Sequence, residues 1–270
     1  MPPVEQHKRL SAGLFVVICL TPIAGSAHPS NSAFQNQTNQ RQIRQSESDV
    51  ARYSAQLKSS DVEERRDAAM RLSVLDGEAA ASALAAALTD PSPLVRAVVA
   101  AGLGERQDPS SAPLLAARLT SDKDAFVRKA AAYALGGFSG AERTAALIGA
   151  IKDRDPEVRG AAAVSLGDHA DPAAISPLTA ALSDKNAFVR AQAARALSVN
   201  GRAAARTVPA LIGLLTSDRD AEVKRQAAAA LGQIGDRSAL SALERASHDA
   251  DTYLGQAARD SIRMIEGGKP

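Results

Sequence analysis

The feature that most constrains the fold is an internal repeat of about 31 residues. A basic residue stands seven positions before an aliphatic one in six successive copies, and a seventh copy keeps the spacing with Gly255 and Ile262. The six pairs are Arg65 and Leu72, Arg96 and Leu103, Arg128 and Leu135, Arg159 and Leu166, Arg190 and Leu197, and Lys224 and Leu231. Such units stack into solenoids, because each can bury its apolar face only against its neighbours.

Each copy predicts two helices that are separated by an acidic turn. Val127, Ala131 and Leu135 follow the helical period and mark the second helix. In the turn, the second aspartate of Asp-x-Asp is expected to cap the second helix. A glycine near the end of that helix is expected to stop it in a left-handed conformation. These glycines are Gly104, Gly136-Gly137, Gly167 and Gly232.

The fold class that follows is all-α, a right-handed α-solenoid of about seven helix pairs over residues 49–265, with a C-terminal tail over 266–270. The composition agrees, because alanine and leucine favour helices and apolar residues make up 45% of the chain. The aliphatic residue of each pair is expected to be core, so Leu135→Ala or Leu166→Ala should cost about 2–5 kcal/mol.

The first 27 residues have the order of a secretory signal peptide. Lys8-Arg9 precedes the apolar run Leu14–Leu20, and Gly25-Ser26-Ala27 supplies the small residues that a signal peptidase requires. We expect cleavage after Ala27 and export to the periplasm or beyond the cell. An uncleaved N-terminal anchor is the alternative.

The segment 28–48 is rich in Gln, Asn and Ser and lacks apolar periodicity, so we expect a disordered polar linker. Cys19 is the only cysteine and lies inside the predicted signal, so the mature chain would hold no disulfide and no cysteine-bound metal. With 32 basic and 30 acidic residues, the net charge of +2 does not favour nucleic acid as a partner.

The run from Asp153 to Gly167, DRDPEVRGAAAVSLG, closely resembles the HEAT-like repeat first associated with phycobilisome lyases, and the resemblance spans about residues 49–265. It implies that the second helices line a concave face. It also implies a structural ladder of acidic and basic residues along the stack, in which each exposed pair would contribute about 0.2–1 kcal/mol. The ladder residues are Asp90, Arg96, Asp122, Arg128, Asp153, Arg159, Asp184, Arg190, Asp218 and Lys224. Ser59 replaces the aspartate in the first unit, as is common in terminal repeats.

No catalytic motif, cofactor or metal site is expected. His28, His169 and His248 stand in no ligand spacing, and no histidine is followed by glutamate. The sequence therefore lacks the His-Glu pairs of deoxyhypusine hydroxylases, which resemble this architecture. Phycobilin lyases share the repeat type, but the predicted export is at odds with their intracellular role.

Columns that vary between repeats are candidates for recognition. They lie one and five places after the basic residue, where the second helices would decorate the concave face. The candidates, chosen because Tyr and Arg are enriched at binding hot spots, are Arg66, Met70, Lys129, Tyr133, Arg195 and Arg225. Phe126 and Phe188 share one repeat position and are interpreted as architectural.

Two functions remain open. The first is a non-catalytic scaffold that binds an extended peptide or protein on the concave face. The alternative is a phycobilin-lyase-like or other HEAT-repeat enzyme, or a chaperone, that acts on a client protein.

Overall fold

The computed structural model describes residues 30–267 of the chain. The chain divides into two compact units, residues 1–43 and 44–270. The predicted signal over 1–27 lies outside the described residues, as do residues 28–29 and 268–270. The paragraphs below concern the second unit, apart from the helix that begins upstream of it.

The second unit is a stack of seven helix pairs, as predicted from the repeat. The first helices are the C-terminal part of α1 (Ser30–Gln56), α3 (Glu78–Ala87), α5 (Ser111–Ser121), α7 (Ala141–Ala150), α9 (Pro172–Ala181), α11 (Val208–Ser217) and α13 (Leu240–Ala246). The second helices are α2 (Val62–Ser73), α4 (Pro93–Arg106), α6 (Ala125–Gly136), α8 (Pro156–Leu166), α10 (Ala187–Ser198), α12 (Ala221–Ile234) and α14 (Thr252–Gly267). The 3-10 turns η1 (Gly201–Thr207) and η2 (Arg237–Ala239) precede α11 and α13.

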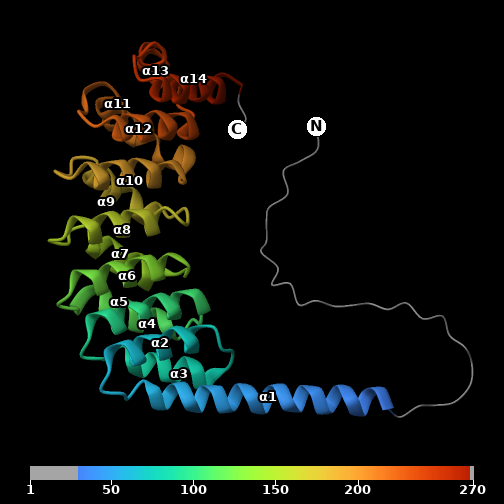
Figure 1. The fold of residues 1–270 in the computed structure, drawn as a ribbon. Helices are drawn as coiled ribbons and strands as arrows, with labels where there is room; N and C mark the ends of the chain where they lie inside the picture. The colour runs from blue at the N-terminus through green and yellow to red at the C-terminus, as the bar shows by residue number, and fades with distance from the viewer. Residues whose placement is uncertain (1–29, 268–270) are drawn as a thin grey trace, which may run out of the picture. The chain divides into compact units, whose positions relative to one another are not determined.

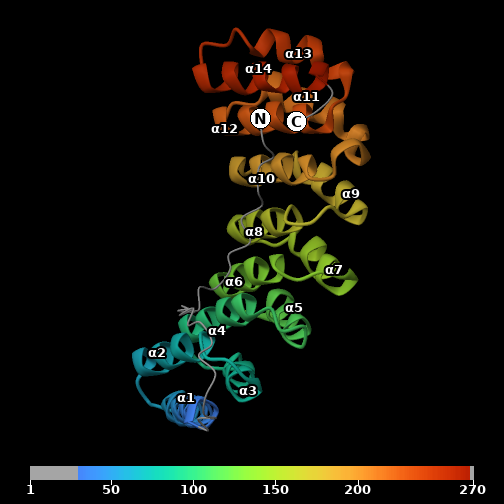
Figure 2. The same ribbon diagram turned by 90° about the vertical axis from the view of Figure 1, so that its right-hand side faces the viewer.

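The two kinds of helix form separate layers, which Figure 2 shows side by side. Neighbouring second helices contact one another more extensively than neighbouring first helices do. The second-helix layer is therefore the more closely packed of the two. No helix among residues 30–267 combines the length and apolar character needed to cross a bilayer.

The prediction of a disordered linker over 28–48 is wrong for residues 30–48, because α1 runs through them. Tertiary packing explains the end of this helix: Val50 is buried in the core, and Tyr53 and Leu57 pack against it. The upstream sequence is rich in Gln, Asn and Ser and shows no apolar helical period, so nothing in it predicted a helix. The predicted tail is also shorter, because α14 extends to Gly267.

The predicted caps at the start of the second helices are present. Asp124 accepts a hydrogen bond from Phe126 N at 2.8 Å, and Asp155 accepts one from Glu157 N at 2.8 Å. Asp220 and Asn186 act in the same way in α12 and α10. The aspartates of the acidic turns therefore accept hydrogen bonds from the free main-chain N–H groups in the first turn of each second helix that they precede.

The prediction that glycines stop the second helices in a left-handed conformation is wrong at the named positions. Gly104 and Gly232 lie inside α4 and α12, and Gly167 caps α8 with φ −80°. Their role is close packing, since a Cβ placed on Gly104 would lie 2.7 Å from the Cα of Ala134 in the next repeat. The left-handed caps are instead Gln107 and Gly235.

The core is one continuous row of aliphatic side chains between the layers. Leu135 and Leu166 are fully buried, as predicted from their place in the repeat. No helix pair could bury this row by itself, so the stability of each repeat depends on its neighbours.

Candidate functional site

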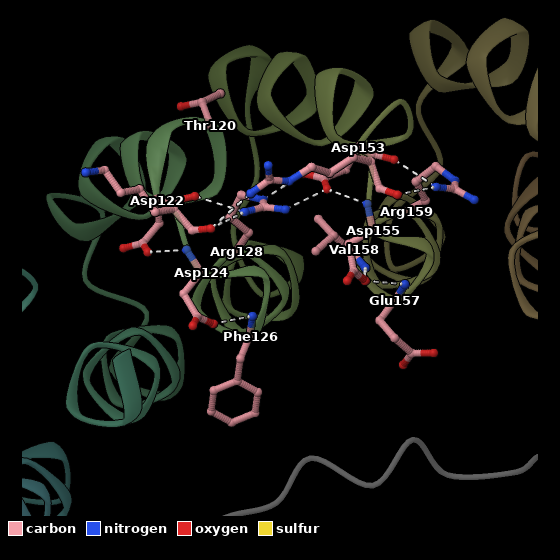
Figure 3. A network of polar contacts seen from close by, with 12 residues as sticks. Thr120, Asp122, Asp124, Phe126, Arg128, Asp153, Asp155, Glu157, Val158 and Arg159 are labelled. Carbon is pink, nitrogen blue, oxygen red and sulfur yellow. Dashed lines mark hydrogen bonds and ion pairs between the residues drawn. The ribbon is translucent and has the colours of Figure 1, made fainter. Parts of the chain in front are cut away.

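The acidic and basic columns form a ladder that crosses from each repeat to the next. Arg128 donates from Nε and Nη2 to both carboxylate oxygens of Asp153, at 2.8 Å each. Its Nη1 donates to the main-chain oxygen of Asp122 in its own repeat, at 3.0 Å. Figure 3 shows this arginine between the two acidic turns. Each rung therefore ties two repeats together.

Five rungs share this geometry. They are Arg65 with Asp90, Arg96 with Asp122, Arg128 with Asp153, Arg159 with Asp184, and Arg190 with Asp218. The expectation of exposed pairs is wrong, because Arg128 and Arg159 are only 4% and 6% exposed. Removing one partner of a buried pair leaves an uncompensated charge, which costs far more than the loss of an exposed pair.

The two ends of the ladder differ from its middle. At the first repeat, Arg65 Nη1 donates to the main-chain oxygen of Ser59 at 2.8 Å. A main-chain acceptor suffices at this position, which explains why serine replaces aspartate there. At the last junction, no ion pair within the described residues involves Lys224, and Arg225 instead contacts Asp251 at 2.7 Å. The assignment of Lys224 to the ladder is therefore wrong.

The carboxylates of the rungs are held in their ionised form. Burial raises the pKa of Asp153, but the hydrogen bonds from Arg128 and from Asp155 N outweigh it, so the pKa lies below the ordinary value of 3.8. The pKa of Asp218 is lowered chiefly by the hydrogen bond from Arg190. The pKa values of Asp122 and Asp184 are lowered as well, against the effect of their burial.

We expect acid to unfold the solenoid by protonating these carboxylates. Their pKa values are lower in the folded than in the unfolded chain, so the stability they contribute is present above about pH 4 and is lost as the pH falls through the folded values. Urea unfolding followed by far-UV circular dichroism at a series of pH values would show this decline. An Asp184→Asn variant should be less stable at neutral pH and less sensitive to acid. An equal acid response in both proteins would contradict the assignment.

The second-helix layer carries the predicted recognition residues, and the structure brings two of them together. Lys129 and Tyr133 line a pocket of about 440 Å³ between α4 and α6. Arg66 pairs with Glu63 and Asp67 on α2, and Arg225 pairs with Glu222 on α12. Met70 on α2 is 53% exposed, and Arg195 lies exposed on α10. These four residues do not line the pocket.

Small residues form much of the pocket, and larger side chains stand around them. The small ones are Ala101, Gly104, Ala130, Ala134 and Gly137. Phe126, Lys129, Tyr133 and Glu105 complete the lining. Gly104 and Ala134 allow α4 and α6 to approach closely, so the floor of the pocket between the two helices is shallow.

The ammonium group of Lys129 makes only long contacts with its neighbours at the pocket. Lys129 Nζ lies 3.8 Å from Glu157 Oε2 and 5.8 Å from the centre of the Phe126 ring. Burial of the ring raises the pKa of the Tyr133 phenol, and the negative charge of Glu157 adds to this effect. The phenol is therefore a hydrogen-bond donor at neutral pH, beside an ammonium group.

Phe126 was interpreted as architectural, but it is 50% exposed and lines the pocket. Figure 3 shows its ring pointing away from the ladder. Phe188, at the same repeat position, packs over Gly160, where a Cβ would lie 2.1 Å from its ring. At the junction that precedes Phe126, the residue that corresponds to Gly160 is Ala97, which carries a methyl group that glycine lacks. This difference was the signal in the sequence that distinguishes the position of Phe126 from that of Phe188.

Comparison with known sequences places the chain in a family. The family described as HEAT repeats matches residues 50–136, 127–198 and 189–263. The chain belongs to the HEAT-repeat family. No curated protein sequence matches the chain significantly.

Solved HEAT-repeat and related structures share the fold. The Escherichia coli protein YibA is 22% identical with a TM-score of 0.63, and the match covers 83% of this chain and 84% of that one. The complex of CpcE and CpcF of phycocyanin lyase from Nostoc sp. PCC7120 is 23% identical with a TM-score of 0.51, covering 80% and 92%. At these identities the likeness shows the fold alone.

The HEAT-repeat scaffold holds no cluster of three or more metal-ligating side chains within residues 30–267. His169 and His248 are exposed in connecting segments, and His28 lies outside the described residues. The pocket between α4 and α6, which Phe126, Lys129 and Tyr133 line, is the candidate binding site.

The last junction of the stack lacks a ladder ion pair at Lys224, and this suggests a stabilising substitution. We expect Lys224→Arg to raise the free energy of unfolding by about 1 kcal/mol, because the guanidinium could reach Asp249, which occupies the acidic column of the last repeat. Urea unfolding would measure the gain. Lys224→Arg combined with Asp249→Asn is the control, and a gain that survives in this double variant would show that no rung forms.

Proposed function

We propose that this protein is an exported, non-catalytic HEAT-repeat scaffold that holds an extended segment of a partner protein on its concave face. The pocket between α4 and α6 carries the proposal, because two aromatic side chains, Phe126 and Tyr133, are each about half exposed there. Exposed aromatic residues beside small ones offer a large apolar contact area, which is typical of binding hot spots.

The chemistry of the pocket suits a peptide. Its lining is mainly apolar, so it would receive one large apolar side chain of the partner. Lys129 and Tyr133 supply donors for a main-chain carbonyl or a carboxylate, and Glu105 supplies an acceptor. The alternative, a phycobilin-lyase-like or other client-modifying activity, would require polar groups that converge on a bound tetrapyrrole or reacting atom. The abundance of small apolar residues in this pocket favours the scaffold.

The proposal of export is based on the order of residues in the N-terminal segment. A basic pair, an apolar run and a set of small residues follow one another over residues 1–27, as in secretory signals. Cell fractionation of the full chain, together with the N-terminal sequence of the mature protein, would test it. A mature protein that begins at His28 in the exported fraction is the expected result.

Photo-crosslinking would test the binding site. We would replace Tyr133 with p-benzoylphenylalanine, irradiate living cells and identify the crosslinked protein. Leu114 on α5 provides the matched control, because it is also a large exposed side chain, 40% exposed, but lies on a first helix. We expect a partner to crosslink at position 133 and not at position 114.

Affinity measurements with the purified partner would complete the test. Phe126→Ala combined with Tyr133→Ala should weaken binding about tenfold or more, as is usual for hot-spot residues. Leu114→Ala should leave the affinity unchanged. Equal crosslinking at both positions, or unchanged affinity in the double variant, would exclude this pocket as the binding site.

A further inference from the structure

The connection between the fifth and sixth helix pairs is the longest departure from the repeat. The basic residues Arg190 and Lys224 are 34 positions apart, whereas most copies are 31 apart. The extra residues form η1, which Gly201 enters with φ +48°. Ala204 and Thr207 of this turn are buried and anchor it to the core.

The 3-10 geometry of η1 sets the direction of its arginines. With three residues per turn, Ala204 and Thr207 lie on one side, so Arg202 and Ala205 lie on another. Arg202 and Ala205 face a cavity of about 490 Å³, whose other lining residues are Ile234, Gly235, Asp236 and Arg237. We call this cavity the arginine pocket. One arginine from each of two successive connections therefore lines the same cavity.

The charges of the arginine pocket are not balanced within the described part of the chain. The guanidinium groups of Arg202 and Arg237 form no ion pair within 4 Å and no hydrogen bond with residues 30–267, in contrast to the ladder arginines. Asp236 is the one carboxylate in the lining, and it accepts a hydrogen bond from Ser238 N at 2.9 Å. The hydrogen bonds from Ser238 and the charge of Arg202 lower the pKa of Asp236, so one carboxylate offsets part of the charge of two arginines. Arg206, on the other side of η1, lines a neighbouring cavity and adds a further cation.

We infer that the arginine pocket binds a carboxylate side chain from an acidic segment of a polypeptide partner. Guanidinium groups are weakly hydrated and bind carboxylates in a two-pronged geometry. Ala205 and Ile234 would contact the methylene groups of a glutamate whose carboxylate lies between Arg202 and Arg237. This site is separate from the pocket between α4 and α6, so a test of binding at one site does not decide binding at the other.

The test uses fluorescein-labelled hexaglutamate and the full chain in a fluorescence anisotropy titration at low and high salt. Arg202→Gln combined with Arg237→Gln should weaken binding about tenfold or more, because it removes both charged donors. Arg71→Gln combined with Arg219→Gln is the control. Both of these residues are exposed, and the control removes the same charge from other places in the stack. Far-UV circular dichroism would establish that all the proteins remain folded.

Binding that weakens only in the Arg202 and Arg237 variant supports the inference. Equal weakening in both double variants would show that net charge alone attracts the peptide, and would overturn it. Inorganic phosphate and acetate at equal ionic strength are the competitors. Displacement by phosphate at concentrations at which acetate has no effect would assign the pocket to a phosphate group and would overturn the carboxylate assignment.

Discussion

Replacing Arg159 with methionine is expected to lower the free energy of unfolding by about 3–5 kcal/mol, because it breaks a buried ion pair from one side. Arg159 Nε and Nη2 bond to the two oxygens of Asp184 at 2.7 and 2.8 Å. Its Nη1 donates to the main-chain oxygen of Asp153 at 2.8 Å. The substitution therefore leaves the carboxylate of Asp184, only 13% exposed, without its charged partner and with the hydrogen bond from Asn186 N alone. It also leaves the main-chain oxygen of Asp153 without the donor from Arg159. Urea unfolding followed by circular dichroism would measure the loss.

The neighbouring Arg154 provides the matched control. Its side chain is exposed and, among the described residues, donates one hydrogen bond, to the main-chain oxygen of Lys123 at 3.1 Å. Arg154→Met should change stability by less than about 0.5 kcal/mol. Combining Arg159→Met with Asp184→Asn should recover part of the loss, since the uncompensated charge is then absent. A loss from Arg159→Met no larger than that from Arg154→Met would show that the rungs do not hold the repeats together.

Leu166→Ala is expected to cost about 2–5 kcal/mol, near the upper end of that range. Leu166 is fully buried at the end of α8, and α8 packs against α10 of the next repeat. A tightly packed row of helices cannot close around the space that the leucine leaves, so the cost includes a cavity in addition to the lost apolar contact. Thermal and urea unfolding would both report the change.

The control for Leu166 is Leu114→Ala, the same substitution at a side chain that is 40% exposed. It should cost less than about 1 kcal/mol, because a surface leucine leaves no cavity. Equal losses in the two variants would contradict the assignment of Leu166 to the core between repeats.

The repeat made most of the fold predictable. The position of each second helix and its buried leucine follow from columns that recur six times along the chain. The aspartate caps follow from a column that keeps aspartate in most copies, with Ser92 and Asn186 as exceptions. Recurrence is informative because each repeat must meet a neighbour of the same shape. The polar helix α1 was not predictable in this way, because its upstream part shows no apolar period and only its end joins the stack.

The candidate site was predictable only in part. Lys129 and Tyr133 were identified from variable columns, and the structure places both in one pocket. Phe126 was assigned to the architecture, because the sequence shows that it shares a column with Phe188 but does not show how each ring packs. The ring of Phe188 packs over Gly160, and the corresponding residue at the junction before Phe126 is Ala97.

The sequence by itself determined that the chain is a stack of HEAT-like helix pairs and which apolar columns would be buried, because helical periodicity and capping are local properties. Only the tertiary structure decided that each ladder arginine bonds to the aspartate of the next repeat, that the glycines serve close packing, and that Arg202 and Arg237 face one cavity. These features depend on distances between helices in different repeats. Such distances depend on the side chains on both sides of a junction. The pattern of residues within one repeat does not specify them.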